Sequence, residues 1–295
     1  MIYYISPVGN NLNDGLSTDN PWLTFVYAQT QMSPGDTLNL MDGTYTETLN
    51  ITISGTSTAP VTFKALNDGQ ATLDGTNNSR AIQIWGVDST NRIKYVTLEG
   101  LVAKNANDHT VTSTFTDNII YRRVSAYNGN GHIWSFNKDT NVLVEDCVGA
   151  DGNQGGDNTG RIAFDLLRVD DSIFRRCYAR VGRDVGSGGQ LQGYQIYGAS
   201  NTILENCIAT FGNNPDRTTR GFNGHEASSK TCTGNQVLGS IAIDLDQPMT
   251  WDNGNRGGGV LTDNNTVKNC VAITREVNAP NGINNVLNIH GTSNT

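Results

Sequence analysis

The chain has few charged residues and few prolines, and it has no long apolar run. Charged residues make up 16 % of the 295 residues, and proline occurs only 7 times, against 33 glycines. No apolar stretch approaches the ~18 residues that a membrane-spanning helix needs, so we expect no membrane span. The low charge and the many Asn, Thr, Gly and Asp residues favour a β-protein with frequent turns.

Positive charge is also scarce. The formal net charge is −8 and the sequence pI is near 4.9, which disfavours nucleic-acid binding by phosphate neutralisation. No basic segment followed by a long apolar segment comes after Met1, so we expect no signal peptide in this chain. The spacing C-x-x-C is absent, so no cysteine-based metal site is predicted.

A short phrase recurs along the chain at near-regular spacing. Each copy has a polar residue, an apolar pair, two polar or charged residues and a small apolar residue. The copies are NIIYRRV (118–124), NVLVEDC (141–147), DSIFRRC (171–177), NTILENC (201–207), NQVLGSI (235–241) and NNTVKNC (264–270). Their last residues are separated by 23, 30, 30, 34 and 29 residues. Repeats of this length are typical of a solenoid, and each coil is predicted to hold two or three short strands.

The first part of the chain differs from the rest. Residues 1–75 are predicted to form an N-terminal cap and the first coils, and residues 76–295 to continue as coils of the same domain. The run Asp19-Asn20-Pro21 predicts the start of an amphipathic helix, with Asp or Asn as the N-cap. We expect this helix to cover one open end of the solenoid, whereas residues 286–295 resemble a further coil with no cap.

A second strand precedes the repeated phrase in several coils, and its side chains should alternate between inside and outside. Trp134, Phe164 and Tyr194 occupy equivalent positions and are predicted to stack inside the solenoid. The residues that follow them should point outward in one row, which continues two residues later. The outward residues are Ser135, Asp165 and Gln195, followed by Asn137, Leu167 and Tyr197.

Two columns of the repeated phrase have structural explanations. Its last position carries Cys147, Cys177, Cys207 and Cys270, which we interpret as a stack of buried thiols. Its fifth position alternates in charge from coil to coil, through Arg122, Glu145, Arg175 and Glu205. Opposite charges on neighbouring strands stabilise a sheet, so we interpret this column as structural. The alternative is an arginine cluster that grips an acidic glycan.

The segments 3–25, 33–47, 53–65 and 71–75 resemble the opening of right-handed parallel β-helix proteins. The resemblance is strongest to pectate lyases of polysaccharide lyase family 9 and related uncharacterised domains. It covers the first 75 residues closely and the remainder through the repeats. It implies a right-handed parallel β-helix with an N-terminal capping helix. It also implies β-elimination at uronic acids, with Ca²⁺ acidifying the C5 proton and a lysine as base.

The chain departs from that family at the residues that carry its chemistry. The family's calcium ligands lie in a stretch like DDGFD, where this chain has RIAFD (161–165) and retains only Asp165. Asp165 is therefore the metal ligand that the resemblance implies, and Arg161 replaces an acid. The family's lysine lies in a stretch like NGFKLGG, where this chain has Asn223. The calcium and lysine motifs are therefore not retained.

A metal-free arrangement of catalytic residues is also possible on the outward face. His225 follows Asn223 by two residues, so both side chains should point the same way. We predict His225 as the base, assisted by Tyr197 or Arg161. Asp165, Gln195, Asn223 and Trp251 are predicted to bind substrate, with Trp251 as a stacking platform in a loop. The alternative is that these are solvated polar residues of a sheet face.

Two functions follow from these features. The first is a carbohydrate-active protein, extracellular or on a cell or virion surface, that binds an acidic polysaccharide and cleaves it by lyase chemistry. The second is a non-enzymatic shaft like that of a phage tailspike or surface adhesin, which would form a homotrimer. Polysaccharide is the expected partner in the first case, and Ca²⁺ is the only cofactor that the resemblance implies.

Overall fold

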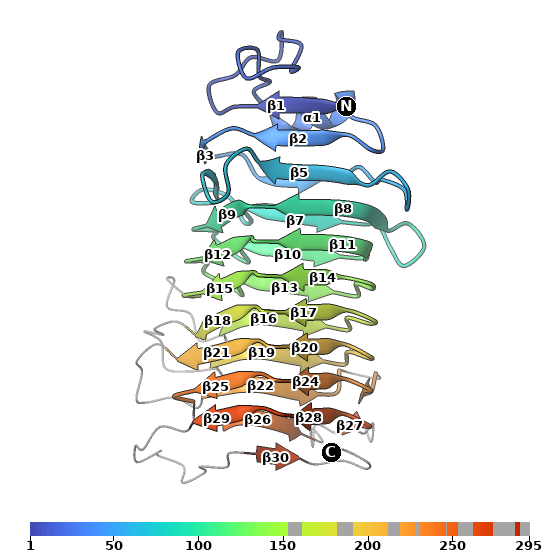
Figure 1. Ribbon diagram of the computed structural model, residues 1–295, viewed down its shortest axis with the longest axis vertical. Coiled ribbons are helices and arrows are strands. Elements are labelled where there is room, and N and C mark those ends of the chain that lie inside the picture. Colours follow the sequence, from blue (N-terminus) through green and yellow to red (C-terminus); the bar gives the residue numbers. More distant parts are fainter. Residues whose placement is uncertain are drawn as a thin grey trace.

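The computed structural model describes residues 1–152, 161–181, 191–211, 219–227, 230–245, 247–252, 262–273 and 287–289. These residues form a stack of coils with the N-terminus near one end and strand β30 at the other (Figure 1). Each complete coil contributes one strand to each of three parallel sheets, which we name A, B and C. The predicted right-handed parallel β-helix is therefore confirmed.

The strands follow one another in the order A, B, C within each coil. Sheet A contains β1 (Ile2–Ile5), β2 (Thr37–Leu40), β5 (Val61–Ala65), β8 (Ile93–Glu99), β11 (Thr116–Arg122), β14 (Leu143–Glu145), β17 (Ile173–Arg175), β20 (Ile203–Glu205), β24 (Gln236–Leu238) and β28 (Thr266–Lys268). Sheet B contains β3 (Gly43–Tyr45), β6 (Ala71–Asp74), β9 (Leu101–Lys104), β12 (Ser125–Tyr127), β15 (Val148–Ala150), β18 (Tyr178–Val181), β21 (Ile208–Phe211), β25 (Ile241–Ile243) and β29 (Val271–Ile273). Sheet C contains β4 (Leu49–Ile51), β7 (Ile82–Trp85), β10 (Val111–Thr114), β13 (Trp134–Asn137), β16 (Arg161–Leu167), β19 (Leu191–Tyr197), β22 (Thr219–His225), β26 (Gln247–Asp252) and β30 (Leu287–Ile289). Two short strands, β23 (Cys232–Thr233) and β27 (Thr262–Asp263), pair with each other.

The repeated phrase forms the sheet A strands and the turn that leads into them. Its first residue has a left-handed backbone in successive coils, with φ of 53° at Asn141, 51° at Asp171 and 53° at Asn201. Asn and Asp tolerate this conformation better than other residues with a side chain. The Asn201 side-chain amide also donates to Asp171 in the coil before it, at 3.1 Å. The first residues of the phrase therefore form a ladder of turn residues.

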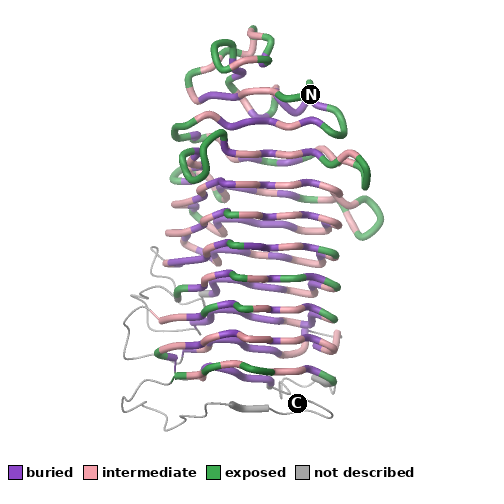
Figure 2. The backbone as a smooth tube through the Cα atoms, viewed as in Figure 1, coloured by how far each residue is buried: buried purple, intermediate pink, exposed green. Residues whose placement is uncertain are grey.

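Aromatic side chains stack along the inside of sheet C, as predicted. Trp134, Phe164 and Tyr194 are fully buried, and Phe222 extends the stack in the next coil. The ring centroids are separated by 5.6, 5.0 and 4.8 Å along this series. In-register parallel strands place equivalent side chains above one another, so the core is a set of columns along the axis. Figure 2 shows buried residues recurring in coil after coil.

The charged column and three of the four cysteines have the structural roles predicted for them, whereas Cys270, also predicted to be buried, is partly exposed because β28, which precedes it, is the end strand of sheet A. Cys147, Cys177 and Cys207 are buried free thiols. In the charged column, Glu145 accepts from Arg122 Nε at 2.9 Å and from Arg175 Nε at 2.6 Å. These partners hold the pKa of Glu145 down to about 2. The arginines of this column are thus committed to ion pairs within the sheet.

The capping helix begins later than the sequence suggests. Helix α1 spans Phe25–Gln31, and its N-cap is Thr24, whose hydroxyl accepts from the Tyr27 backbone N–H at 3.3 Å. The prediction of an Asp or Asn cap was wrong because Trp22 forms an isolated parallel bridge with Ile5. That bridge keeps the chain extended until Thr24. Within the described residues, no helix is long and apolar enough to cross a membrane.

Candidate functional site

The outward face of sheet C carries a row of polar side chains in register. Ser135 lies opposite Asp165, Asp165 opposite Gln195, and Gln195 opposite Asn223. We name these four residues the central row. Phe164 and Leu166, which flank Asp165 in the strand, lie in the core. Because side chains alternate along a strand, Asp165 and its register partners point outward. The predicted outward row is therefore present.

Three members of the central row are much less exposed than a solvated sheet face would be. The exposed fraction is 7 % for Asp165, 9 % for Gln195 and 0 % for Asn223. Buried polar groups are costly unless they form hydrogen bonds, so their partners decide what the row can do.

Asp165 is the least satisfied member of the row. Its Oδ1 has no hydrogen-bond partner within the described residues, and its Oδ2 lies 3.9 Å from His132 Nε2. Burial raises the pKa of Asp165 to about 7. A carboxyl with a pKa near neutrality can exchange a proton at physiological pH, which is the property of a general acid or base.

His132 approaches Asp165 from the preceding coil, and it packs against a second histidine, His109. The rings of His109 and His132 stack with centroids 4.8 Å apart and planes 6° apart. The His132 backbone N–H donates to His109 Nδ1 at 3.0 Å. The interval between the two histidines equals that between their neighbours Val111 and Trp134, which are register partners. The equal intervals put His109 and His132 at equivalent positions of adjacent coils, so their proximity could have been predicted from the sequence.

At the end of the central row away from Ser135, Gln195 and Asn223 belong to a network of hydrogen-bonded amide side chains. Gln192 Nε2 donates to Gln195 Oε1 at 2.9 Å, and Asn223 Nδ2 donates to Gln192 Oε1 at 2.9 Å. Arg220 adds a cation, with Nη1 3.4 Å from Asn223 Oδ1. Gln192 reaches the outer face although it lies three residues before Gln195, because Gly193 and Tyr194 both face inward. A Cβ on Gly193 would lie 2.9 Å from the Ala209 Cβ inside the coil.

Tyr197 and His225 form a second pair on the same face. They are register partners on β19 and β22, and their rings stack with centroids 4.3 Å apart. Both are partly exposed. His225 follows Asn223 by two residues and shares its outward direction, as predicted. From strand spacing and rise, His225 lies ~12 Å from Asp165, so the two share a face without contact.

Two predicted site residues do not join this arrangement. Trp251 is 2 % exposed and lies in the core, in strand β26 rather than in a loop, so its predicted role as a stacking platform was wrong. The ring fits inside because its register partner is Gly224, where a Cβ would lie 1.5 Å from the ring. Arg161 pairs with Leu191 at the start of β16, and its side chain lies outside the described part of the structure.

The described residues do not form a donor set suited to calcium. Ca²⁺ takes six to eight oxygen ligands, several of them carboxylates. Within the described ranges, no group of three or more acidic, histidine or cysteine side chains is placed to hold a metal ion. Asp165 contributes one orphaned carboxylate oxygen, and the Gln195 amide oxygen already accepts from Gln192. Calcium binding at Asp165 stays a prediction.

Comparison with known sequences finds similarity over about a quarter of the chain. No family model matches. The uncharacterized protein YwoF of Bacillus subtilis is 32 % identical over 78 residues, which are 26 % of this chain and 16 % of YwoF. Pectate lyase L of Dickeya dadantii is 36 % identical over 81 residues, which are 25 % of this chain and 19 % of the lyase. The chain thus matches less than a fifth of the length of these curated relatives.

Solved structures resemble a much larger part of the chain. Pectate lyase Pel9A has a TM-score of 0.65 at 19 % identity, covering 91 % of this chain and 69 % of Pel9A. A rhamnogalacturonan lyase has a TM-score of 0.63 at 13 % identity, covering 100 % of this chain and 86 % of that structure. The predicted resemblance to pectate-lyase-like β-helix proteins is thereby confirmed at the level of the fold.

Proposed function

We propose that this β-helix binds an acidic polysaccharide along the outer face of sheet C and cleaves it by β-elimination outside the cell or on its surface. The observation that carries the proposal is the arrangement on that face. An ionisable pair, Tyr197 and His225, lies beside a row of hydrogen-bonding side chains in register. The names of the similar proteins, a pectate lyase and a rhamnogalacturonan lyase, support a uronate-containing substrate.

β-Elimination requires a base, an acid and a group that balances negative charge. In this proposal His225, Tyr197 and Arg220 supply these three functions. His225 accepts the C5 proton of a uronate residue, and the released electron pair forms the C4–C5 double bond. The bond from C4 to the glycosidic oxygen breaks as Tyr197 donates its hydroxyl proton to that oxygen. Arg220 balances the negative charge that develops on the uronate carboxylate.

Asp165 and His132 have a separate role in this proposal. Asp165 lies two coils from His225 and His132 lies three coils from it, so both are too far away to act on the same C5 proton. Asp165 Oδ1 is buried and has no partner among the described residues, so in this proposal Asp165 forms part of the floor beneath a neighbouring sugar residue and does not contact that sugar directly. The central row is therefore a binding subsite, and the Tyr197–His225 pair is the catalytic subsite.

The experiment follows the unsaturated product. The protein is incubated with polygalacturonate, rhamnogalacturonan and alginate, each with Ca²⁺ or with a chelator, and the ultraviolet absorbance of the new double bond is recorded. His225→Gln and Tyr197→Phe should each slow the reaction by about 10²- to 10⁴-fold. Tyr178→Phe is the matched control, because Tyr178 lies on sheet B and its hydroxyl bonds to Thr210.

The outcomes separate catalysis from binding. Absence of product on all three substrates would rule out the lyase. Binding of a polysaccharide without product would favour the non-enzymatic shaft, for which sedimentation should then show the homotrimer. Activity that needs Ca²⁺ and disappears in Asp165→Asn, but persists in His225→Gln, would replace the metal-free assignment.

A further inference from the structure

Trp85 is an exposed aromatic side chain on the same outer face as Tyr197 and His225. It is the last residue of β7, and Ile84 before it lies in the core, so the indole ring points outward. The exposed fraction of Trp85 is 45 %. Single exposed apolar residues are common on protein surfaces, so the surroundings of Trp85 decide whether it has a role in binding.

Strand register connects Trp85 to the Tyr197–His225 pair in one continuous row. We name this row the second row, and it contains, in order, Trp85, Thr114, Asn137, Leu167, Tyr197 and His225. Four register steps of ~4.8 Å separate Trp85 from Tyr197, so the two lie ~19 Å apart along the axis. A saccharide chain that contacts both must therefore cover several sugar residues.

Arg80 holds the Trp85 ring in place. The carbon of the Arg80 guanidinium lies 4.7 Å from the ring centroid, and Arg80 Nη2 donates to Asp108 Oδ2 at 3.1 Å. Because the guanidinium covers one face of the indole, the exposed area belongs to the opposite face and to the ring edge. A ring already held in one orientation loses little conformational freedom when a ligand packs on it.

The β-sheet does not require an aromatic side chain at this position. Thr114 and Asn137 occupy it in the next two coils, and both are partly exposed. An indole that stays in water contributes little to stability through burial, whereas a ligand that covers it removes apolar area from water. The Trp85 ring is therefore better suited to a binding role than to a packing role.

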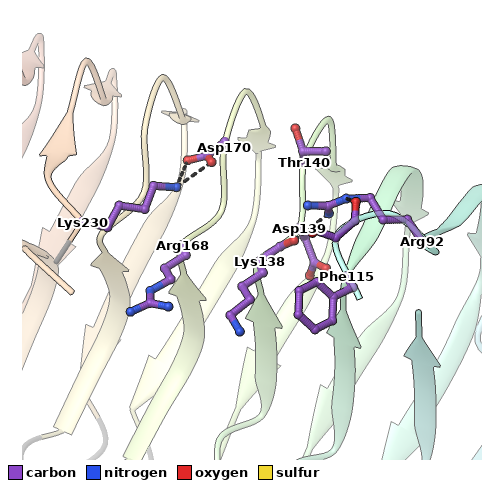
Figure 3. A pocket seen from close by; sticks show the side chains of 9 residues that line it. Arg92, Phe115, Lys138, Asp139, Thr140, Arg168, Asp170 and Lys230 are labelled. Carbon is purple, nitrogen blue, oxygen red and sulfur yellow. Dashed lines mark hydrogen bonds and ion pairs between the residues drawn. The ribbon is translucent and has the colours of Figure 1, made fainter. Parts of the chain in front are cut away.

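The turn that follows the sheet C strands borders the second row. It encloses a cavity of about 260 Å³ with a mainly charged and polar lining (Figure 3). Lys230 pairs there with Asp170. Arg92 donates to the backbone carbonyls of Thr116 and Lys138. Because these groups already have protein partners, we place a saccharide over the second row and not in the cavity.

We propose that Trp85 is a distal stacking platform, which binds a sugar residue of the same polysaccharide chain that reaches the Tyr197–His225 pair. One face of a pyranose ring carries C–H groups that pack on an indole, while its hydroxyl groups stay hydrated. Thr114 and Asn137 lie between the platform and the pair and offer hydrogen-bonding groups to the sugars in between. The platform thus favours long chains over short ones. This inference rests on the polysaccharide of the proposed function, but not on its cleavage.

Quenching of tryptophan fluorescence by acrylamide reports on Trp85, because the other three tryptophans are at most 3 % exposed. At least one of polygalacturonate, rhamnogalacturonan and alginate should reduce the quenching. Trigalacturonate is too short to span the second row, so it should bind near the Tyr197–His225 pair and leave the quenching unchanged. The measurement is made on the wild type and on His225→Gln, in which the chain should stay long.

Calorimetric titration of Trp85→Ala tests whether the protection comes from stacking. The affinity for the protecting polysaccharide should fall by about three- to tenfold, and the affinity for trigalacturonate should not change. Tyr127→Ala is the matched control, because Tyr127 is a partly exposed aromatic residue on sheet B, and it should change neither affinity. Circular dichroism establishes that both variants keep the β-fold.

The other outcomes overturn the platform or the reaction separately. Quenching that no polysaccharide reduces, or equal affinities of Trp85→Ala and the wild type for the long chain, would overturn the platform. An equal loss of affinity for trigalacturonate and the long chain would also overturn it, because the whole face would then have changed. Protection of Trp85 without any lyase product would refute the proposed reaction and leave the platform standing. Lyase product without protection of Trp85 would refute the platform alone.

Discussion

Replacing Asp165 by asparagine should stabilise the protein at pH 8 much more than at pH 5. The Asp165 side chain is 7 % exposed, its Oδ1 has no hydrogen-bond partner among the described residues, and burial raises its pKa to about 7. An aspartate in an unfolded chain has a pKa of about 3.9. The folded state thus holds the proton more tightly than the unfolded state, so stability falls as the pH rises from about 4 to about 7.

The size of the effect follows from the difference between the two pKa values. They differ by about 3 units, and each unit corresponds to about 1.4 kcal/mol, so ionising Asp165 costs the folded state roughly 4 kcal/mol. About 3 kcal/mol of this cost develops between pH 5 and pH 8. The Asp165→Asn side chain is nearly isosteric and does not ionise, so the variant should not show this part of the pH dependence.

Equilibrium unfolding in urea at pH 5, 6, 7 and 8 measures the difference in unfolding free energy between Asp165→Asn and the wild type. The readout is the change in this difference with pH, which cancels any pH-independent effect of the amide. Asp171→Asn is the control, because Asp171 is exposed at a turn. A difference that stays constant from pH 5 to pH 8, or that changes equally in the control, would refute the buried, raised-pKa carboxyl.

Three further predictions concern the scaffold. Glu145→Gln should destabilise the protein by about 1 kcal/mol at pH 7 and less towards pH 2, because arginine partners lower the Glu145 pKa to about 2; urea unfolding at both pH values measures this. Gly224→Ala should lower the unfolding free energy by about 1–3 kcal/mol, because the new Cβ would overlap the Trp251 ring. An unchanged midpoint of urea unfolding would contradict that packing. In the native protein, a thiol reagent should modify the partly exposed Cys270 before the buried Cys147, whose pKa is raised to about 12, and mass spectrometry of peptides can rank them.

The sequence was a good guide wherever a position repeats from coil to coil. The stack of Trp134, Phe164 and Tyr194 and the outward position of Asp165 follow from strand alternation and coil spacing alone. The pairing of Glu145 with its arginine neighbours follows from the same spacing. Parallel in-register strands convert a sequence interval into a spatial column, so these contacts could be predicted without coordinates.

The prediction failed where the chain leaves that regular pattern. Trp251 is predicted to lie in a loop, but the space left by Gly224 in the adjacent strand admits its ring to the core. The helix begins at Phe25 rather than near Pro21 because Trp22 bridges to Ile5. Both errors arise from contacts with a neighbouring strand that is distant in the sequence.

The chemistry of the site depends most on tertiary structure. A repeat places Asp165 on a face, but its raised pKa depends on how deeply neighbouring coils bury it and on the absence of a partner for Oδ1 within the described residues. The repeat also does not reveal that Arg92 and Lys230 line one cavity with Lys138 and Arg168, because Arg92 and Lys230 come from turns that differ in length from the other two. Strand pairing is a local rule that repeats along the chain, whereas burial and the paths of turns are set by every coil together.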